Sequence, residues 1–122
     1  MIRVLLADDQ ALVRAGFRAL LDAEDDIEIV GEAPDHAAAL VGVAETLPDV
    51  VLLDMVVGPV DPGFAAALQE AAPQTRILIL SGHPPERVDP DLLARAVGHV
   101  PKSTAFDELA GAIRAALSTN VR

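Results

Sequence analysis

The chain has 122 residues, of which 52% are hydrophobic and 23% are charged. This length fits one folded domain with a single core, and the composition excludes a disordered or fibrous chain. The formal net charge is −10, with 19 acidic residues against 9 basic ones and no basic cluster, so we expect no direct binding of nucleic acid or of an anionic membrane surface. The chain has no cysteine, which excludes disulfides and cysteine zinc sites and favours a cytoplasmic setting.

In the first half of the chain, short apolar runs alternate with stretches in which apolar residues recur at helical spacing. Runs at 4–7, 27–30 and 50–53 are strand candidates, and the first is far too short to span a bilayer. Helical spacing of apolar residues follows each run. The three helical stretches contain Ala11 to Leu20, Ala37 to Ala44 and Phe64 to Ala71.

The second half continues the alternation. A fourth strand is predicted at 77–80, and three prolines in residues 83–90 delay the next helix until the region of Leu92. A weak strand at 97–100 precedes a last helix that Thr104 can cap and that ends near Ser118. The acidic side chains of Asp107 and Glu108 suit the start of that helix. Its expected apolar stripe is Phe106, Leu109, Ala110, Ile113 and Leu117.

Five repeats of strand and helix predict an α/β fold: a doubly wound, five-stranded parallel sheet flanked by five helices. Continuous apolar runs in the first, third and fourth strands fit this sheet, because helices cover both faces of its central strands. We expect one domain over residues 1–118, followed by a tail or the start of a linker over residues 119–122.

Polar residues collect where the predicted strands stop, at the edge where open parallel sheets bind ligands. Asp8 and Asp9 follow the first strand, Asp54 the third and Ser81 the fourth, and Lys102 comes soon after the fifth. Singly, the acids and the serine fit helix caps or turns, and a lysine is ordinarily solvated. Together, and with Lys102 the only lysine of the chain, they predict one site.

Three carboxylates in one crevice repel each other unless a cation neutralises them, and hard oxygen ligands suit Mg²⁺. A magnesium ion leaves coordination positions for a phosphoryl oxygen, while a lysine and a hydroxyl supply further charge and a hydrogen bond. The site therefore indicates phosphoryl transfer to a carboxylate.

These residues resemble those of a bacterial two-component response-regulator receiver domain: paired acids at Asp8 and Asp9, an acceptor at Asp54, a hydroxyl at Ser81 and Lys102. Residues 3–17 (RVLLADDQALVRAGF) further resemble the subgroup whose receiver precedes a LuxR-type helix-turn-helix. The resemblance spans essentially the whole chain and implies the flavodoxin-like receiver fold.

The resemblance also implies roles for the site residues. Asp54 would accept a phosphoryl group from a sensor histidine kinase, and Lys102 would pair with that group. Ser81 and His99 would act as switch residues, and the output would be homodimerisation that controls transcription through a domain absent from this chain. The residues that would hold Mg²⁺ are Asp8, Asp9, Asp54 and the backbone carbonyl of Val56.

Two departures from the family pattern leave other functions open. The loop after Asp54 is shifted by one residue, and His99 stands where the family commonly has an aromatic switch residue. A degenerate receiver, acting as a phosphorylation-independent interaction or dimerisation module, is the main alternative. A hydrolytic phosphatase is a third possibility, but Val56 stands where it would need a second aspartate. The other two histidines, His36 and His83, are expected at the surface.

Overall fold

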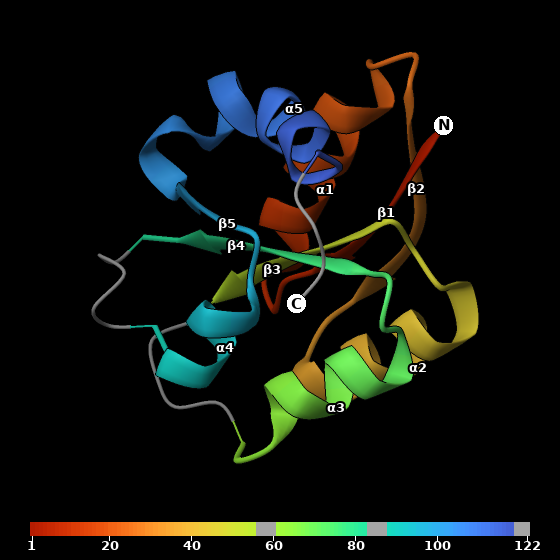
Figure 1. Cartoon of the computed structure of the whole chain (residues 1–122). Coiled ribbons are helices and arrows are strands. Elements are labelled where there is room, and N and C mark those ends of the chain that lie inside the picture. Colours follow the sequence, from red (N-terminus) through yellow and green to blue (C-terminus); the bar gives the residue numbers. More distant parts are fainter. Residues whose placement is uncertain (56–60, 83–87, 119–122) are drawn as a thin grey trace.

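The structure is a computed structural model of the chain and describes residues 1–55, 61–82 and 88–118. Within these ranges, the strands form one parallel sheet in the order β2-β1-β3-β4-β5 (Figure 1). The strands are β1 (Ile2–Ala7), β2 (Ile27–Ala33), β3 (Val50–Met55), β4 (Arg76–Ser81) and β5 (Gly98–Pro101). The helices are α1 (Ala11–Asp22), α2 (His36–Thr46), α3 (Phe64–Ala71), α4 (Pro90–Arg95), the short 3₁₀ helix η2 (Lys102–Thr104) and α5 (Ala105–Ala116).

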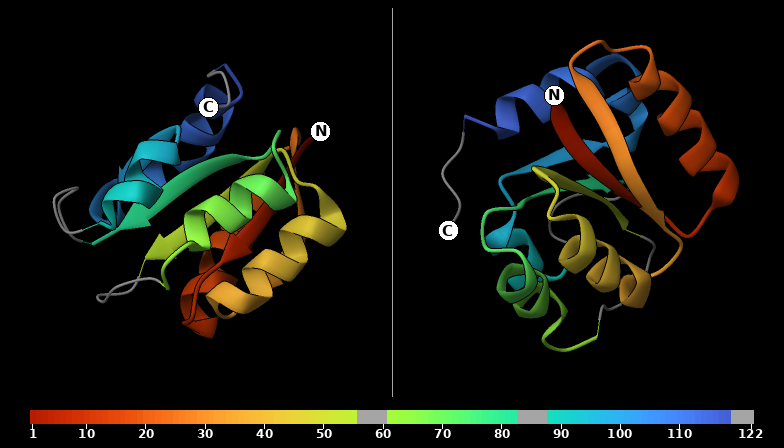
Figure 2. Two further views of the ribbon diagram at one scale, coloured as in Figure 1. Left: turned by 60° about the horizontal axis from the view of Figure 1, so that its bottom comes forward. Right: turned by 90° about the vertical axis from the view of Figure 1, so that its right-hand side faces the viewer.

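Helices cover both faces of the sheet. Figures 1 and 2 show α1 and α5 on one face and α2, α3 and α4 on the other. Successive side chains of a strand point to opposite faces, so each central strand contributes to two cores. Leu52 belongs to the core under α1 and α5, whereas Leu53 belongs to the core under α2, α3 and α4. The predicted doubly wound sheet is confirmed.

The strand bounds differ from the predicted ones: β1, β3 and β4 each extend one or two residues beyond the predicted apolar run. β2 extends to Ala33, because Gly31 and Glu32 still pair with β1 although they interrupt the apolar run. β5 is shifted by one residue and includes Pro101, which pairs with Ser81. Apolar runs mark burial, whereas strand bounds follow backbone pairing, and the two need not end at the same residue.

The fifth helix packs differently from the predicted stripe. Its buried residues are Ala105, Leu109, Ile113 and Ala116. Phe106 is 59% exposed and was wrongly placed in the core; its ring instead stacks on Phe17 of α1, with ring centroids 5.1 Å apart. Thr104 occupies the capping position, but its side chain makes no capping bond and donates to the carbonyl of Pro101. Ala105, which directly follows the 3₁₀ helix η2, is fully buried in the core under α1 and α5.

The fourth helix contains Leu92 as predicted, but it begins earlier, at one of the prolines expected to delay it. α4 begins at Pro90, and the side chain of Asp89 accepts a hydrogen bond from the backbone N–H of Leu92 at 3.0 Å. Proline suits this first helical position because a backbone N–H there would have no partner inside the helix.

No helix among the described residues has both the length and the apolar character needed to cross a membrane.

Candidate functional site

The sheet brings the predicted residues to its carboxyl edge. Asp8 comes directly after β1, and Asp54 lies near the end of β3, paired with Leu80 of β4. Ser81 is the last residue of β4, and Lys102 follows β5. All strands are parallel, so their carboxyl ends share one edge, and residues far apart in the chain become neighbours there.

Asp54 and Lys102 form the central contact of this site. The Nζ atom of Lys102 lies 2.8 Å from Oδ2 of Asp54. The Asp54 side chain is only 2% exposed, whereas that of Lys102 is 33% exposed. The only lysine of the chain therefore reaches from the surface to a buried carboxylate, which places a positive charge beside the predicted acceptor.

Asp8 is the second buried acid of the site, and it interacts with Asp54. Burial raises the pKa of Asp54 to about 7; the neighbouring Asp8 carboxyl also raises it, and Lys102 lowers it. Lys102 thus only partly offsets the burial of two acids. Such a pair needs further positive charge to ionise fully.

The donor atoms at this edge fit a divalent cation. Oδ2 of Asp8 and Oδ1 of Asp54 are buried and have no hydrogen-bond partner among the described residues. Buried polar atoms usually have a partner, so these two oxygens are available to a ligand. Carboxylate oxygens are hard ligands of the kind that Mg²⁺ prefers.

The other predicted metal ligands do not complete the site among the described residues. Asp9 is exposed, and within residues 1–55, 61–82 and 88–118 no group of three or more histidine or acidic side chains is placed to hold a metal. Asp9 does not cap α1 either, because Gln10 occupies that position. Val56 and the shifted loop after Asp54 lie outside the described residues. The metal roles of Asp9 and Val56 stay predictions.

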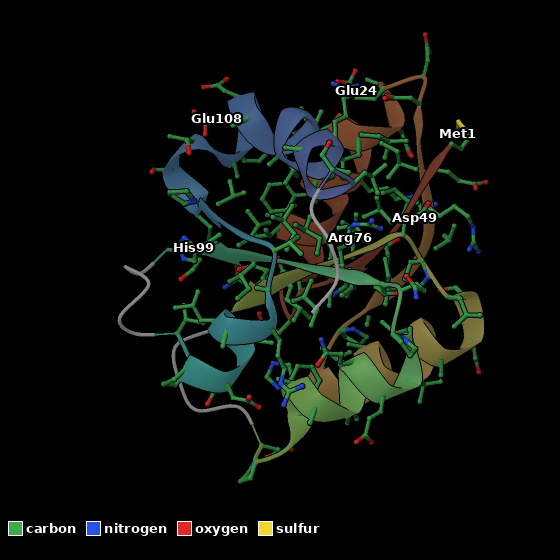
Figure 3. All side chains as sticks on the ribbon, in the orientation of Figure 1. Met1, Glu24, Asp49, Arg76, His99 and Glu108 are labelled. Atoms are coloured by element: carbon green, nitrogen blue, oxygen red, sulfur yellow. The ribbon has the colours of Figure 1, made fainter. Side chains whose placement is uncertain are left out.

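Ser81 and His99, the two predicted switch residues, lie on the neighbouring strands β4 and β5. Ser81 is buried and pairs with Met55 on one side and with Pro101 on the other. His99 is half-buried on β5, the strand at one edge of the sheet (Figure 3), and its Nε2 atom is buried without a hydrogen-bond partner among the described residues. An imidazole therefore occupies the predicted switch position, and its switching role stays a prediction.

The two remaining histidines, His36 and His83, were both predicted to lie at the surface. His36 was expected at the surface, but it is half-buried and stacks on the ring of Phe64, with centroids 4.5 Å apart. The contact joins the start of α2 to the start of α3, two elements whose proximity the sequence pattern does not show. His83 lies outside the described residues.

Arg14 is a site residue that the sequence analysis missed. Its Nη1 atom donates to the carbonyl of Asp8 at 2.6 Å, and its Nε atom lies 3.2 Å from Oε1 of Glu32 on β2. One signal could have identified it. A basic side chain one turn into a helix opposes the helix dipole, so its presence in α1 indicates a specific partner.

The fold and site together define a class of protein. A doubly wound parallel sheet carries, at its carboxyl edge, a buried acidic pair and a lysine within contact of one acid. This arrangement is that of a phosphoacceptor signalling domain. A family model described as "Response regulator receiver domain" matches residues 4–114, and the chain belongs to this family. Phosphorylation-driven switching is the general function of the family, and its members are signalling domains rather than enzymes.

Curated relatives agree with this assignment. The chain is 43% identical over 118 residues to the uncharacterized transcriptional regulatory protein YxjL of Bacillus subtilis, covering 94% of this chain and 54% of that protein. It is 40% identical over 119 residues to the transcriptional regulatory protein LiaR of the same organism, covering 95% of this chain and 56% of LiaR. The chain thus spans about half the length of the curated relatives it matches.

Solved structures show the same fold. The signal receiver domain of the putative response regulator NarL from Mycobacterium tuberculosis is 34% identical, with a TM-score of 0.83 and 98% of each chain covered. A two-component response regulator of the LuxR family from Aurantimonas sp. is 32% identical, also with a TM-score of 0.83, covering 98% of this chain and 86% of that one. The chain is therefore a receiver of the LuxR and NarL type.

Proposed function

We propose that this chain accepts a phosphoryl group on Asp54 from a phosphohistidine of a sensor histidine kinase. The contact between Lys102 and the buried carboxylate of Asp54 is the observation that carries the proposal. A carboxylate oxygen of Asp54 attacks phosphorus, the bond between phosphorus and the histidine nitrogen breaks, and an aspartyl phosphate forms. Lys102, already beside Asp54, then pairs with the transferred group.

A magnesium ion fits this site. Asp8, Asp9, Asp54 and the backbone carbonyl of Val56 would hold it, and the unpartnered oxygens of Asp8 and Asp54 support the first part of that ligand set. When bound, Mg²⁺ offsets the negative charge that gathers on the phosphoryl oxygens during transfer.

The signal would be a change in the face formed by α4, β5 and α5. Ser81, at the end of β4, would move to hydrogen-bond the phosphoryl group, and His99 on β5 would follow it. The expected output is homodimerisation. Two of the relatives carry the description "transcriptional regulatory protein" and are about twice as long as this chain, which supports control of transcription through a further domain. A cytoplasmic location is consistent with a kinase partner of this kind.

Chemical phosphorylation tests this function. The purified chain is incubated with a small-molecule phosphodonor, with and without Mg²⁺, and its mass is measured intact. We expect one phosphoryl group per chain that requires Mg²⁺ and is absent from Asp54→Asn. A folded parent protein that takes no label would contradict the proposal.

The degenerate receiver remains the second candidate. It is favoured by His99 at the switch position, because an imidazole replaces the aromatic side chain that the family commonly has there. A degenerate receiver would take no phosphoryl group. Its oligomeric state would therefore be the same with and without the phosphodonor. A phosphatase would instead turn over a phosphomonoester many times, and we expect no such turnover.

A further inference from the structure

The turn between β1 and α1 carries Asp8 and Asp9, two of the three acids of the proposed cation site. Two backbone contacts hold its ends: the N–H of Asp8 donates to the carbonyl of Ala33 at 3.0 Å, and the N–H of Arg14 donates to the carbonyl of Gln10 at 3.0 Å. Neither contact orients the Asp8 carboxylate itself. Asp8 and Asp54 are both buried and line one small pocket, so their carboxylates repel each other when both are charged. Something must hold Asp8 in place against that repulsion.

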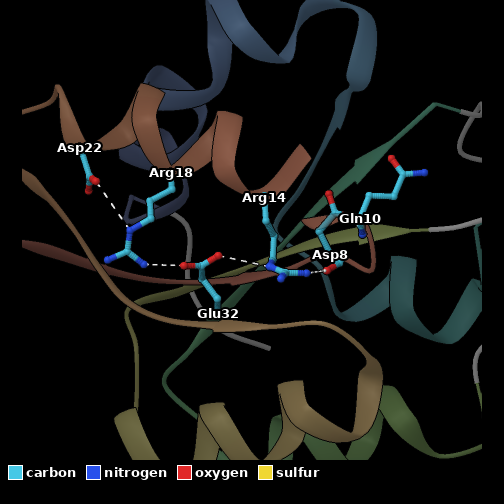
Figure 4. A network of polar contacts seen from close by, with 6 residues as sticks. All are labelled: Asp8, Gln10, Arg14, Arg18, Asp22 and Glu32. Atoms are coloured by element: carbon cyan, nitrogen blue, oxygen red, sulfur yellow. Dashed lines mark hydrogen bonds and ion pairs between the residues drawn. The ribbon is translucent and has the colours of Figure 1, made fainter. Parts of the chain in front are cut away.

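The Arg14 side chain is placed to do so. Its side chain is 18% exposed, and its guanidinium joins the Asp8 carbonyl to Glu32 on the edge strand β2 (Figure 4). Asp8 and Arg14 also line one small pocket together with Asp54. The Arg14 contact goes to the Asp8 backbone and not to its carboxylate, so the arginine does not compete with a cation for the carboxylate oxygens.

The Asp8 carboxylate is then oriented by a second contact within the turn. Its Oδ1 atom accepts the backbone N–H of Gln10 at 2.8 Å. With the carbonyl of Asp8 held by Arg14 and Oδ1 held by Gln10, the remaining oxygen, Oδ2, is buried and has no hydrogen-bond partner among the described residues. The turn thus leaves one Asp8 oxygen free for a ligand beside Asp54.

We propose that Arg14, anchored by Glu32, is a positioning residue that keeps the Asp8 carboxylate beside Asp54 and so sets the affinity of the site for a divalent cation. The inference rests on the proposed function for the identity of that cation. An arginine suits the task because its planar fork donates to two partners at fixed angles, which a lysine ammonium does less well. Groups that orient a metal ligand typically change metal affinity 10- to 100-fold when they are removed.

Arg18 provides a matched control. Its Nη1 atom lies 2.6 Å from Oε2 of the same Glu32, and its Nε atom lies 3.7 Å from Asp22 (Figure 4). Within the described part of the chain, its polar contacts are with these two acids and not with Asp8. Arg14→Met and Arg18→Met each remove one positive charge and one ion pair to Glu32. Arg14→Met also removes the contact to the Asp8 carbonyl, whereas Arg18→Met also removes the ion pair to Asp22.

The test uses two measurements on the full chain. Mg²⁺ binding is titrated by NMR, because the chain has no tryptophan or tyrosine to report binding by fluorescence. The exchange rate of the Gln10 amide is measured without metal, in EDTA, since that amide reports the contact to Oδ1 of Asp8. Unfolding curves confirm that each variant is folded. Arg14→Lys, which keeps the charge, and Glu32→Gln, which weakens the anchor, serve if Arg14→Met does not fold.

We expect Arg14→Met to raise the Kd for Mg²⁺ roughly tenfold and to speed Gln10 amide exchange, while Arg18→Met changes neither. Arg14→Lys should show most of the same increase in the Kd for Mg²⁺ and in the Gln10 exchange rate. Glu32→Gln should raise both quantities by a smaller amount. Equal Gln10 exchange in Arg14→Met and Arg18→Met overturns the inference whatever Mg²⁺ does. It is also informative if the parent chain binds no Mg²⁺ while the Gln10 amide loses its protection from exchange only in the Arg14 variants. That result supports the positioning role of Arg14 and contradicts the metal site of the proposed function.

Discussion

Replacing Asp54 with asparagine should stabilise the metal-free protein at neutral pH and leave it unchanged in acid. Burial raises the pKa of Asp54 from 3.8 to about 7, with the Asp8 carboxyl adding to the rise and Lys102 opposing it. Between these two values the folded chain keeps a proton that the unfolded chain has lost, so stability falls as pH rises. The loss is absent below pH 3.8 and complete above about pH 7.

The size of this effect follows from the shift. Three pKa units correspond to about 4 kcal/mol at 1.36 kcal/mol per unit. Solvent reaches Lys102 and the mouth of the site, and its screening reduces the expected effect to about 1–2 kcal/mol. Asparagine keeps the shape of the side chain and can still accept a hydrogen bond from Lys102, so the substitution removes chiefly the charge.

The assay is urea unfolding followed by far-UV circular dichroism, in EDTA, at several pH values between 4 and 8. Asp54→Asn should match the parent near pH 4 and exceed its stability by about 1–2 kcal/mol near pH 8. Adding Mg²⁺ should stabilise the parent and not the variant, because a ligand stabilises only the state that binds it. A difference that stays constant with pH, or that favours the parent near pH 8 in EDTA, would refute the reasoning.

Three further substitutions test other parts of the structure. Lys102→Ala should still take a phosphoryl group but no longer dimerise in response, as size-exclusion chromatography would show; unchanged dimerisation would exclude a coupling role. Leu52→Ala should cost about 2–5 kcal/mol in urea unfolding, because Leu52 is fully buried, whereas Leu12→Ala at an 87% exposed position should cost almost nothing. Asp35→Ala should cost about 1 kcal/mol, because the Asp35 side chain caps α2 by accepting the N–H of Ala38 at 2.7 Å; an unchanged unfolding midpoint would contradict this.

Much of the fold could be predicted from the sequence because burial leaves a periodic pattern. Leu52 and Leu53 are adjacent in the chain and belong to opposite cores, and only a strand covered on both faces requires apolar residues at both positions. Sequence patterns served less well where two helices meet. Phe106 is apolar at helical spacing, yet its ring lies over Phe17 of α1 and remains largely exposed.

The candidate site also has one part that the sequence predicted and one part that only the structure showed. The meeting of Asp54 and Lys102 follows from the chain itself, because parallel strands bring their carboxyl ends to one edge and each residue stands near the end of its strand. The sequence pattern therefore suffices to place these two residues at one edge of the sheet, and the strand order of the structure brings their side chains into contact.

Only the tertiary structure decided how the acids are held. Arg14 meets Glu32 because α1 packs beside β2, and a register shift in the pairing of β1 with β2 precedes Glu32. Neither residue belongs to a local pattern that specifies the other. Local sequence determines which elements form and which ends carry polar groups, whereas the choice of partner for a long, flexible side chain depends on the packing of elements distant in the chain.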